Sequence, residues 1–355
     1  MDQQNEKHTR RVRYRGTHPK KYNEKYKELN PEKYGDTIEK VISKGSTPAG
    51  MHISIMVNEI LEFLDIKPGQ IGYDATLGYG GHTLAMMNCM NHEGHMYATD
   101  VDPIESAKTK ERLKSKGYDE DFLTIKLMNF ADMDKLVEEV GPFDFILADL
   151  GVSSMQIDNP ERGFSYKVEG PLDLRLNPET GISAAERLAT ITREEFQGML
   201  EENSDEPYAY ELSAALKEAQ RKGKTFDTTG SLKQLIEETI LRLPETRKLS
   251  NTDQKELVKK TSARVFQALR IDVNNEFEVL YQFMDKLPNA LAPNGRAAIL
   301  TFHSGEDKLV KKALKEGLRA GLYKEIAKDV IRPSAEECVR NSRARSTKMR
   351  WAIKA

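Results

Sequence analysis

The chain has 355 residues, of which 38% are hydrophobic and 31% are charged, and this is enough for one large or two ordinary domains with buried cores. No run of about 18 apolar residues occurs and the first residues are polar, so we expect neither a membrane span nor a secretory signal. The two cysteines, Cys89 and Cys338, are far apart in the sequence, which argues against a disulfide framework or a zinc site and favours a cytoplasmic protein.

The net charge of −2 conceals an uneven distribution. Residues 1–50 hold 12 Lys and Arg against 7 Asp and Glu, and residues 331–355 hold 7 against 2. Basic ends on an acidic middle indicate attraction to a polyanion, although a solubilising tail explains the charge equally well. If the C-terminal end meets phosphates, the candidate residues are Arg343, Arg345, Lys348 and Arg350.

The elements follow one another in an order that indicates the fold class. Residues 1–50 show no sustained apolar period and predict a basic, mobile or weakly helical arm. A helix is expected over 54–64. Short apolar runs then predict five strands, at 71–76, 95–99, 123–127, 143–149 and 297–302. Helical patterns lie between most of these strands, so we expect an α/β fold with a doubly wound, Rossmann-like parallel sheet.

The fourth and fifth predicted strands are separated by almost 150 residues, far too many for a simple crossover. Much of this stretch has a helical pattern, and capping boxes that begin at Ser183 and Thr192 predict helix starts. We therefore expect a small helical domain over 163–262, inserted into a sheet domain made of 51–162 and 263–355.

A glycine-rich turn follows the first predicted strand, where residues 74–83 read DATLGYGGHT. Glycines allow a ligand to touch the backbone, and an acid at the end of the next strand, Asp100, can accept hydrogen bonds from both hydroxyls of a ribose. The two features together favour an adenosine cofactor. NAD is the alternative, but its G-x-G-x-x-G pattern would need glycine where this chain has Thr83, so S-adenosylmethionine fits better.

A second acidic segment, ADLGVSS at 148–154, follows the fourth predicted strand. In a doubly wound sheet this is where a substrate meets the cofactor. Asp149 could accept a hydrogen bond from an amine that is about to be methylated, or it could cap the next element. In the loop that follows, Arg162 and Arg175 could grip phosphate or pair with nearby acids such as Asp173.

Several long segments, in the same order, resemble the bacterial family that methylates N4 of a cytosine in the decoding centre of 16S ribosomal RNA. The similarity extends from about residue 52 to residue 350. The matching segments are 74–83 (DATLGYGGHT), 99–103 (TDVDP), 129–130 (NF), 149–158 (DLGVSSMQID), 160–166 (PERGFSY), 170–176 (GPLDLRL), 265–274 (VFQALRIDVN), 301–307 (TFHSGED) and 341–350 (NSRARSTKMR).

The resemblance implies an S-adenosylmethionine-dependent methyltransferase with a helical insert for substrate recognition, and no metal. By position, Gly80, Gly81 and His82 would line the methionine end of the cofactor, and Asp100 would hold its ribose. Phe130 would lie beside the adenine. Two further residues, Asp149 and Gln156, would contact the cofactor or the methyl-transfer region, with Asp149 as the candidate catalytic residue.

The same resemblance implies 16S ribosomal RNA as the partner, within the small subunit or a late assembly intermediate, and leaves the oligomeric state open, with a dimer as one option. Tyr79, Met155 and Gly305 depart from the family's usual residues and indicate a diverged or second copy. Two alternatives stay open: methylation of another RNA cytosine, and a non-catalytic assembly factor for the small subunit.

Overall fold

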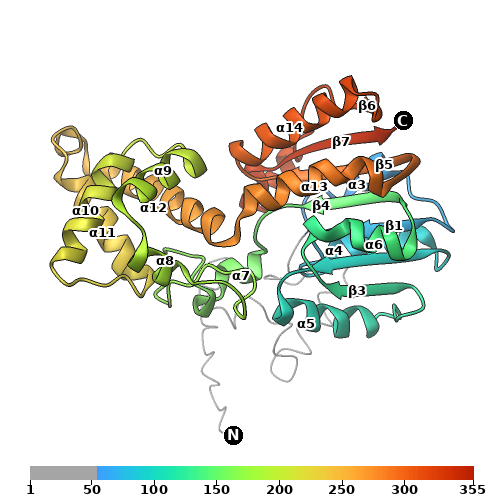
Figure 1. Cartoon of the computed structure of the whole chain (residues 1–355), viewed down its shortest axis with the longest axis horizontal. Coiled ribbons are helices and arrows are strands. Elements are labelled where there is room, and N and C mark those ends of the chain that lie inside the picture. Colours follow the sequence, from blue (N-terminus) through green and yellow to red (C-terminus); the bar gives the residue numbers. More distant parts are fainter. Residues whose placement is uncertain (1–53) are drawn as a thin grey trace, which may run out of the picture. The chain divides into compact units, whose positions relative to one another are not determined.

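The computed structural model describes residues 54–355, so the predicted arm over 1–50 lies outside the described residues. The described part contains a seven-stranded mixed sheet with the order β3-β2-β1-β4-β5-β7-β6 (Figure 1). Five parallel strands confirm the predicted α/β class, and the two last strands, which the sequence analysis did not predict, add an antiparallel edge. The strands are β1 Ile71–Asp74, β2 His95–Asp100, β3 Leu123–Leu127, β4 Phe143–Asp149, β5 Leu291–Thr301, β6 Tyr323–Ile326 and β7 Lys348–Lys354.

The strand order reverses at β1, which pairs in parallel with β2 on one side and with β4 on the other. In the register, Asp74 at the end of β1 lies opposite Ala98 of β2 and Leu147 of β4. Ligands of doubly wound sheets bind beyond the carboxyl ends of the strands where the order reverses. The fold therefore places the ends of β1, β2 and β4 at the expected ligand-binding edge.

Alternating residues of β4 show how the two faces of the sheet are covered. Phe145 and Leu147 point to one face and Ile146 and Ala148 to the other, and all four are fully buried. The first face packs against the helices α3 Val57–Leu64, α4 Gly81–Met90 and α5 Pro103–Lys114. The second face packs against α6 Met133–Val140, α13 Glu276–Ala290 and α14 Ser304–Arg319.

A second group of helices packs around a core of its own, and Figure 1 shows it gathered around the long helix α12. The group consists of α8 Ala184–Thr190, α9 Arg193–Ser204, α10 Ala209–Arg221, α11 Thr229–Arg242 and α12 Asn251–Asn274. The capping boxes predicted at Ser183 and Thr192 are present and begin α8 and α9. The expected boundary after residue 262 falls inside α12, and the division into domains stays a prediction.

Six short helical elements in the described part of the chain lie between the longer ones. They are η2 Phe130–Asp132, α7 Ser154–Asp158, η3 Pro160–Arg162, η4 Thr246–Lys248, α15 Ala335–Arg340 and η5 Ser342–Ser346. Two of them, α7 and η3, connect β4 to the second group of helices. Over the described range, 54–355, every helix is too short or too polar to cross a membrane.

The basic residues near the C-terminus are largely engaged with carboxylates. Arg350 is 5% exposed and donates from Nε to Oδ1 of Asp307 at 2.6 Å, while Lys348 donates to Oδ2 at 3.0 Å. Burial on its own would raise the pKa of Asp307, but the hydrogen bonds from Arg350 and Lys348 hold this pKa below its usual value. Arg343 pairs with Asp158 at 2.7 Å. The expectation that all four cations meet phosphate is therefore wrong for Arg350, whose side chain is buried in an ion pair.

We expect Arg350→Met to lower the free energy of unfolding by about 3 kcal/mol, because it leaves the carboxylate of Asp307 without its closest partner. Arg345→Met is the matched control, since that side chain is exposed, and it should change stability by less than about 0.5 kcal/mol. Urea denaturation of the two variants tests this. Equal stabilities would contradict the importance of the pair.

Candidate functional site

Three aspartates end three neighbouring parallel strands: Asp74 ends β1, Asp100 ends β2 and Asp149 ends β4. Because the strands are parallel and adjacent, all three carboxyl groups lie at the same end of the sheet, which is the edge formed by the carboxyl ends of the strands. Asp74 is 1% exposed and accepts hydrogen bonds from Thr83 Oγ1 at 2.6 Å and from the Thr76 amide at 3.0 Å. Burial raises the pKa of Asp74. Asp74 thus holds the glycine-rich turn to the start of α4.

The turn between β1 and α4 requires glycine at two positions. Gly80 has φ +74°, and a Cβ on it would lie 2.7 Å from Cγ2 of Thr109. A Cβ on Gly81 would lie 2.0 Å from Oγ of Ser54. Side chains would therefore force the turn away from its neighbours. The turn leads directly into the N-terminus of α4 and lies at the same end of the sheet as the aspartates.

Asp100 connects this turn to the next one. Its Oδ2 accepts a hydrogen bond from the Gly78 amide at 2.7 Å, and its Oδ1 accepts one from the Asp102 amide at 2.9 Å. Burial raises the pKa of Asp100 to about 6. An ionised carboxylate has about four acceptor positions, so two remain for a ligand. Paired acceptors of this kind suit the two neighbouring hydroxyls of a ribose.

Asp149 has one oxygen that is available for a ligand. Its amide donates to Thr76 Oγ1 at 2.7 Å, and its Oδ2 lies 3.4 Å from Nδ1 of His82. Over residues 54–355, Oδ1 of Asp149 finds no hydrogen-bond partner although the atom is buried. A buried acceptor without a partner is costly and indicates that a ligand completes the site.

His82 is 7% exposed and lies between two oxygen acceptors, the carboxylate of Asp149 and the carbonyl of Ile55, which is 2.9 Å from Nε2. Burial alone would lower the pKa of His82, but the hydrogen bonds and charge of these neighbours raise it overall. These two acceptors thus favour the protonated form of the His82 ring.

The other two predicted site residues, Phe130 and Gln156, contact protein groups other than the three aspartates that end β1, β2 and β4. Phe130 follows β3 and packs edge-on against Phe283 of α13, with ring centroids 5.2 Å apart. Gln156 is 7% exposed, donates from Nε2 to Oδ2 of Asp102 at 2.8 Å, and accepts a hydrogen bond from the Ser153 amide. Its side-chain amide thus links α7 to the turn after β2.

Sequence reasoning missed the ion pair between Asp102 and Arg162. Asp102 is fully buried and Arg162 is 7% exposed, and their side chains meet at 2.6 Å. Of the two interpretations offered for Arg162, phosphate binding has no support in this geometry, and its acid partner is 60 residues away. Arg175 does pair with Asp173, at 2.7 Å. The Asp-Pro pair at 102–103, which typically begins a helix, was the available signal for a structural role of Asp102.

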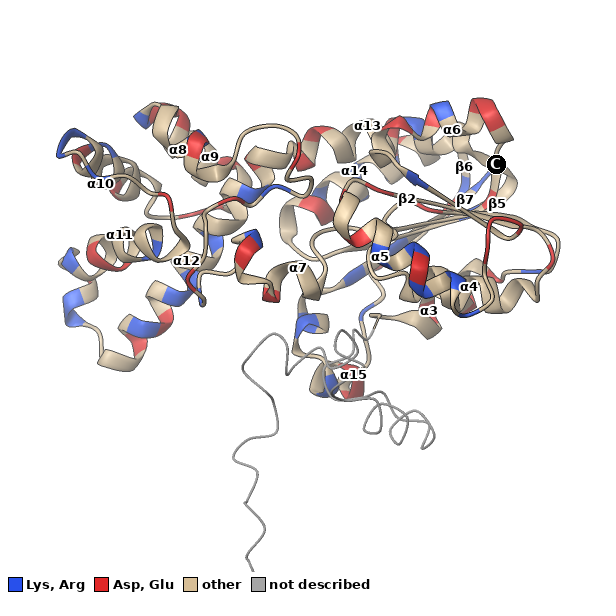
Figure 2. Ribbon diagram, turned by 90° about the horizontal axis from the view of Figure 1, so that it is seen from below, with Lys and Arg blue, Asp and Glu red and all other residues tan. Residues whose placement is uncertain are grey.

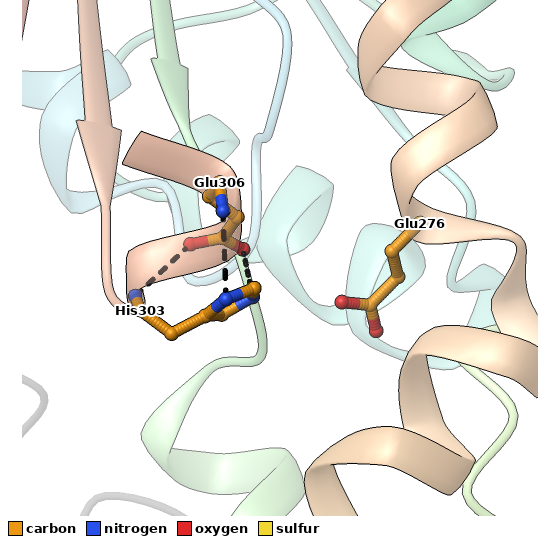
Figure 3. A group of neighbouring side chains, drawn as sticks. All are labelled: Glu276, His303 and Glu306. Carbon is orange, nitrogen blue, oxygen red and sulfur yellow. Dashed lines mark hydrogen bonds and ion pairs between the residues drawn. The ribbon is translucent and has the colours of Figure 1, made fainter. Parts of the chain in front are cut away.

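A further group, Glu276, His303 and Glu306, brings its ligand atoms within 4.8 Å of one another (Figure 3). Each member already has a protein partner. Nε2 of His303 lies 3.2 Å from Oε1 of Glu306, which also accepts from the Phe302 amide through Oε2, and Arg270 donates two hydrogen bonds to Glu276. We interpret the group as a helix cap beside an ion pair and assign no metal to it.

Fold and site together define a class of protein. A doubly wound sheet with an antiparallel β7, a glycine turn after β1 and an acidic acceptor at the end of β2 is the architecture of class I S-adenosylmethionine-dependent methyltransferases. The residues present fit this cofactor: the turn after β1 lacks side chains at Gly80 and Gly81, Asp100 has acceptors left for hydroxyls, and within residues 54–355 the buried Oδ1 of Asp149 finds no hydrogen-bond partner.

Residues 49–355 match the MraW methylase family, and the chain belongs to it. It is 69% identical over 348 residues to "Ribosomal RNA small subunit methyltransferase H 1" of Agathobacter rectalis, with 98% of each chain covered. It is also 61% identical over 355 residues to "Ribosomal RNA small subunit methyltransferase H 2" of Alkaliphilus metalliredigens, with 100% of both covered. The chain is thus a methylase, and its cofactor is S-adenosylmethionine.

Among solved structures, the chain is similar to a SAM-dependent O-methyltransferase from Thermotoga maritima, with 11% identity and a TM-score of 0.39. That alignment covers 86% of this chain and 67% of the other.

The raised pKa of Asp100 predicts a pH dependence of cofactor affinity. Hydroxyl donors favour the ionised carboxylate, so binding lowers the pKa of Asp100, and affinity should rise as pH increases through about 6. Below this pH the dissociation constant of S-adenosylhomocysteine, measured by calorimetry, should increase by at most about tenfold per pH unit.

Asp100→Asn separates this effect from that of His82, which also titrates with a raised pKa. The variant should lose the part of the pH dependence that Asp100 contributes. If its pH profile is the same as that of the unaltered protein, Asp100 does not titrate in contact with the ligand.

Proposed function

We propose that this methylase transfers a methyl group to the N4 amine of a cytosine in the decoding centre of 16S ribosomal RNA. Two observations support small-subunit ribosomal RNA as the substrate class. The chain belongs to the MraW methylase family, and its relatives are named as methyltransferases of small-subunit ribosomal RNA. The observation that carries the proposal is the buried Oδ1 of Asp149 at the carboxyl end of β4, for which residues 54–355 supply no hydrogen-bond partner.

Asp149 is the residue to which we give the main chemical role. The lone pair of an exocyclic amine is delocalised into the cytosine ring, so the amine must be turned and held before it can attack. An acceptor for an amine hydrogen does this, and Oδ1 of Asp149 has no competing partner in the described part of the chain. Thr76 fixes the backbone of Asp149, while His82 contacts Oδ2 and restricts the orientation of the carboxylate.

When bound, S-adenosylmethionine supplies a methyl group that is activated by the adjacent sulfonium. We propose that the ribose is held by Asp100 and that the methionine end is lined by Gly80, Gly81 and His82. Phe130 would lie beside the adenine. Gln156 would contact the cofactor from α7, and its link to Asp102 would set its position.

Methylation at C5 of cytosine is the competing chemistry and needs a cysteine thiolate that adds to the ring. Cys89 is exposed on α4, and Cys338 is partly exposed on α15. Neither belongs to the segment that follows Asp149. The absence of a cysteine from that segment favours the amine over the ring carbon.

For the substrate, we propose recognition by the helices of the 163–262 region together with the basic arm over 1–50, within the small subunit or a late assembly intermediate. Figure 2 shows Lys and Arg interspersed with Asp and Glu over α8 to α12, so these helices do not form a purely basic surface. We further propose a cytoplasmic location.

We expect Asp149→Ala to lower the rate of methyl transfer by tenfold or more, about 1.4 kcal/mol or greater in the barrier, because the amine loses its acceptor. The affinity for S-adenosylhomocysteine, measured in the same variant, separates loss of the acceptor from loss of the cofactor. The control is the double variant Cys89→Ser and Cys338→Ser, which should keep most of the activity.

Mass spectrometry of nucleosides from treated small subunits identifies the methylated atom. The proposal requires N4-methylcytidine. Detection of 5-methylcytidine or a methylated purine would overturn it, and the absence of any methylation would favour the non-catalytic assembly factor.

A further inference from the structure

Arg162 joins three segments that are distant in the sequence. Its Nη1 donates to Oδ2 of Asp102 in the turn after β2, at 2.6 Å. Its Nη2 donates to the carbonyls of Arg175 and Leu176, at 3.1 and 2.8 Å, in the loop that leads to the second group of helices. One side chain thus connects the turn beside Asp100 with the loop that precedes α8.

Asp102 is the centre of this arrangement. Its Oδ1 caps α5 by accepting from the amides of Ile104 and Glu105, and its Oδ2 accepts from both Gln156 and Arg162. The same residue donates its own amide to Oδ1 of Asp100. Any displacement of Asp102 therefore moves the acid that we assign to the ribose.

The pair is too deeply buried to be explained by stability alone. Asp102 is 0% exposed, and Arg162 and Gln156 are each 7% exposed. Removing two charges from water costs about as much as their attraction returns, so a buried pair is often replaceable by apolar residues without loss of stability. What it does provide is a fixed geometry, because each hydrogen bond constrains a direction.

The connection continues to α12. The amide of Leu176 donates to Oδ1 of Asn274 at 2.7 Å, and Nδ2 of Asn274 donates to the carbonyls of Leu174 and Arg270 at 2.8 Å each. The loop held by Arg162 is thus also held by the end of the longest helix of the second group.

We propose that Arg162 is a positioning residue for methyl transfer, which acts through Asp102 to hold Asp100 and Gln156 in place for the cofactor. This rests on the proposed function for the roles of Asp100 and Gln156. Arg162 itself touches neither cofactor nor substrate in this account. Its effect on the cofactor is carried entirely by Asp102.

Calorimetry of the full chain with S-adenosylhomocysteine tests the proposal. Arg162→Met should weaken binding by about tenfold or more, since small displacements of binding groups have large effects. Arg162→Lys retains a charge beside Asp102 and should recover part of the loss. The matched control is Arg175→Met, which breaks an ion pair with Asp173 in the same loop and should change affinity by less than about twofold.

A mutant cycle distinguishes positioning from general damage. If Arg162 acts through Asp100 and Gln156, then Arg162→Met should weaken binding by less than about threefold in a chain that already carries both Asp100→Ala and Gln156→Ala. Losses that multiply in the combined variant would overturn the proposal, as would unchanged affinity in Arg162→Met alone.

Should Arg162→Met fail to fold, Asp102→Asn combined with Arg162→Met removes the unpaired buried charge, and asparagine still caps α5. This variant should fold and still bind the ligand at least about fivefold more weakly, because the link between the two loops is absent. Affinity equal to that of the unaltered protein would show that the link has no positioning role. None of these measurements uses RNA, so their outcome does not depend on which atom of the substrate is methylated.

Discussion

Strand β1 is hydrogen-bonded in parallel to β2 on one side and to β4 on the other, so the ends of three strands meet at one edge of the sheet. Each of the three ends in an aspartate: Asp74, Asp100 and Asp149. Three acidic groups in a small, largely buried region are unfavourable unless each is hydrogen-bonded or paired. Much of the local structure at this edge follows from that requirement.

The three carboxyl groups are satisfied in different ways, and these differences separate their roles. Asp74 is buried among protein donors and holds the glycine turn. Asp100 is bound by two backbone amides and keeps acceptor positions for a ligand. Asp149 is held by His82 on one oxygen, and none of the described residues donates a hydrogen bond to the other. The same end of the sheet therefore carries one acid with a structural role, Asp74, and two for which we propose a role, Asp100 in cofactor binding and Asp149 in methyl transfer.

The sequence was sufficient where local patterns determine structure. Apolar runs predicted the five parallel strands, because that signal lies within short segments. The assignment of the glycine turn and Asp100 to the cofactor comes from signals of the same local kind and stays a prediction. The sequence was insufficient where distant residues meet. The segment of β7 contains Lys348 and Arg350, so its local pattern is that of a basic tail. Their partner, Asp307, lies 41 and 43 residues before them in the sequence and is brought beside them only by the fold. The pair of Asp102 and Arg162 likewise depends on the fold and has no local signal that joins its members.

The most direct test of the account is a crystal structure of the full chain with S-adenosylhomocysteine bound. The account predicts that both ribose hydroxyls donate to Asp100, that the amino-acid end lies against the turn at Gly80 and Gly81, and that Oδ1 of Asp149 faces the sulfur side of the ligand. A ligand bound away from Asp100, or a conformation in which Oδ1 of Asp149 is covered by protein, would contradict it.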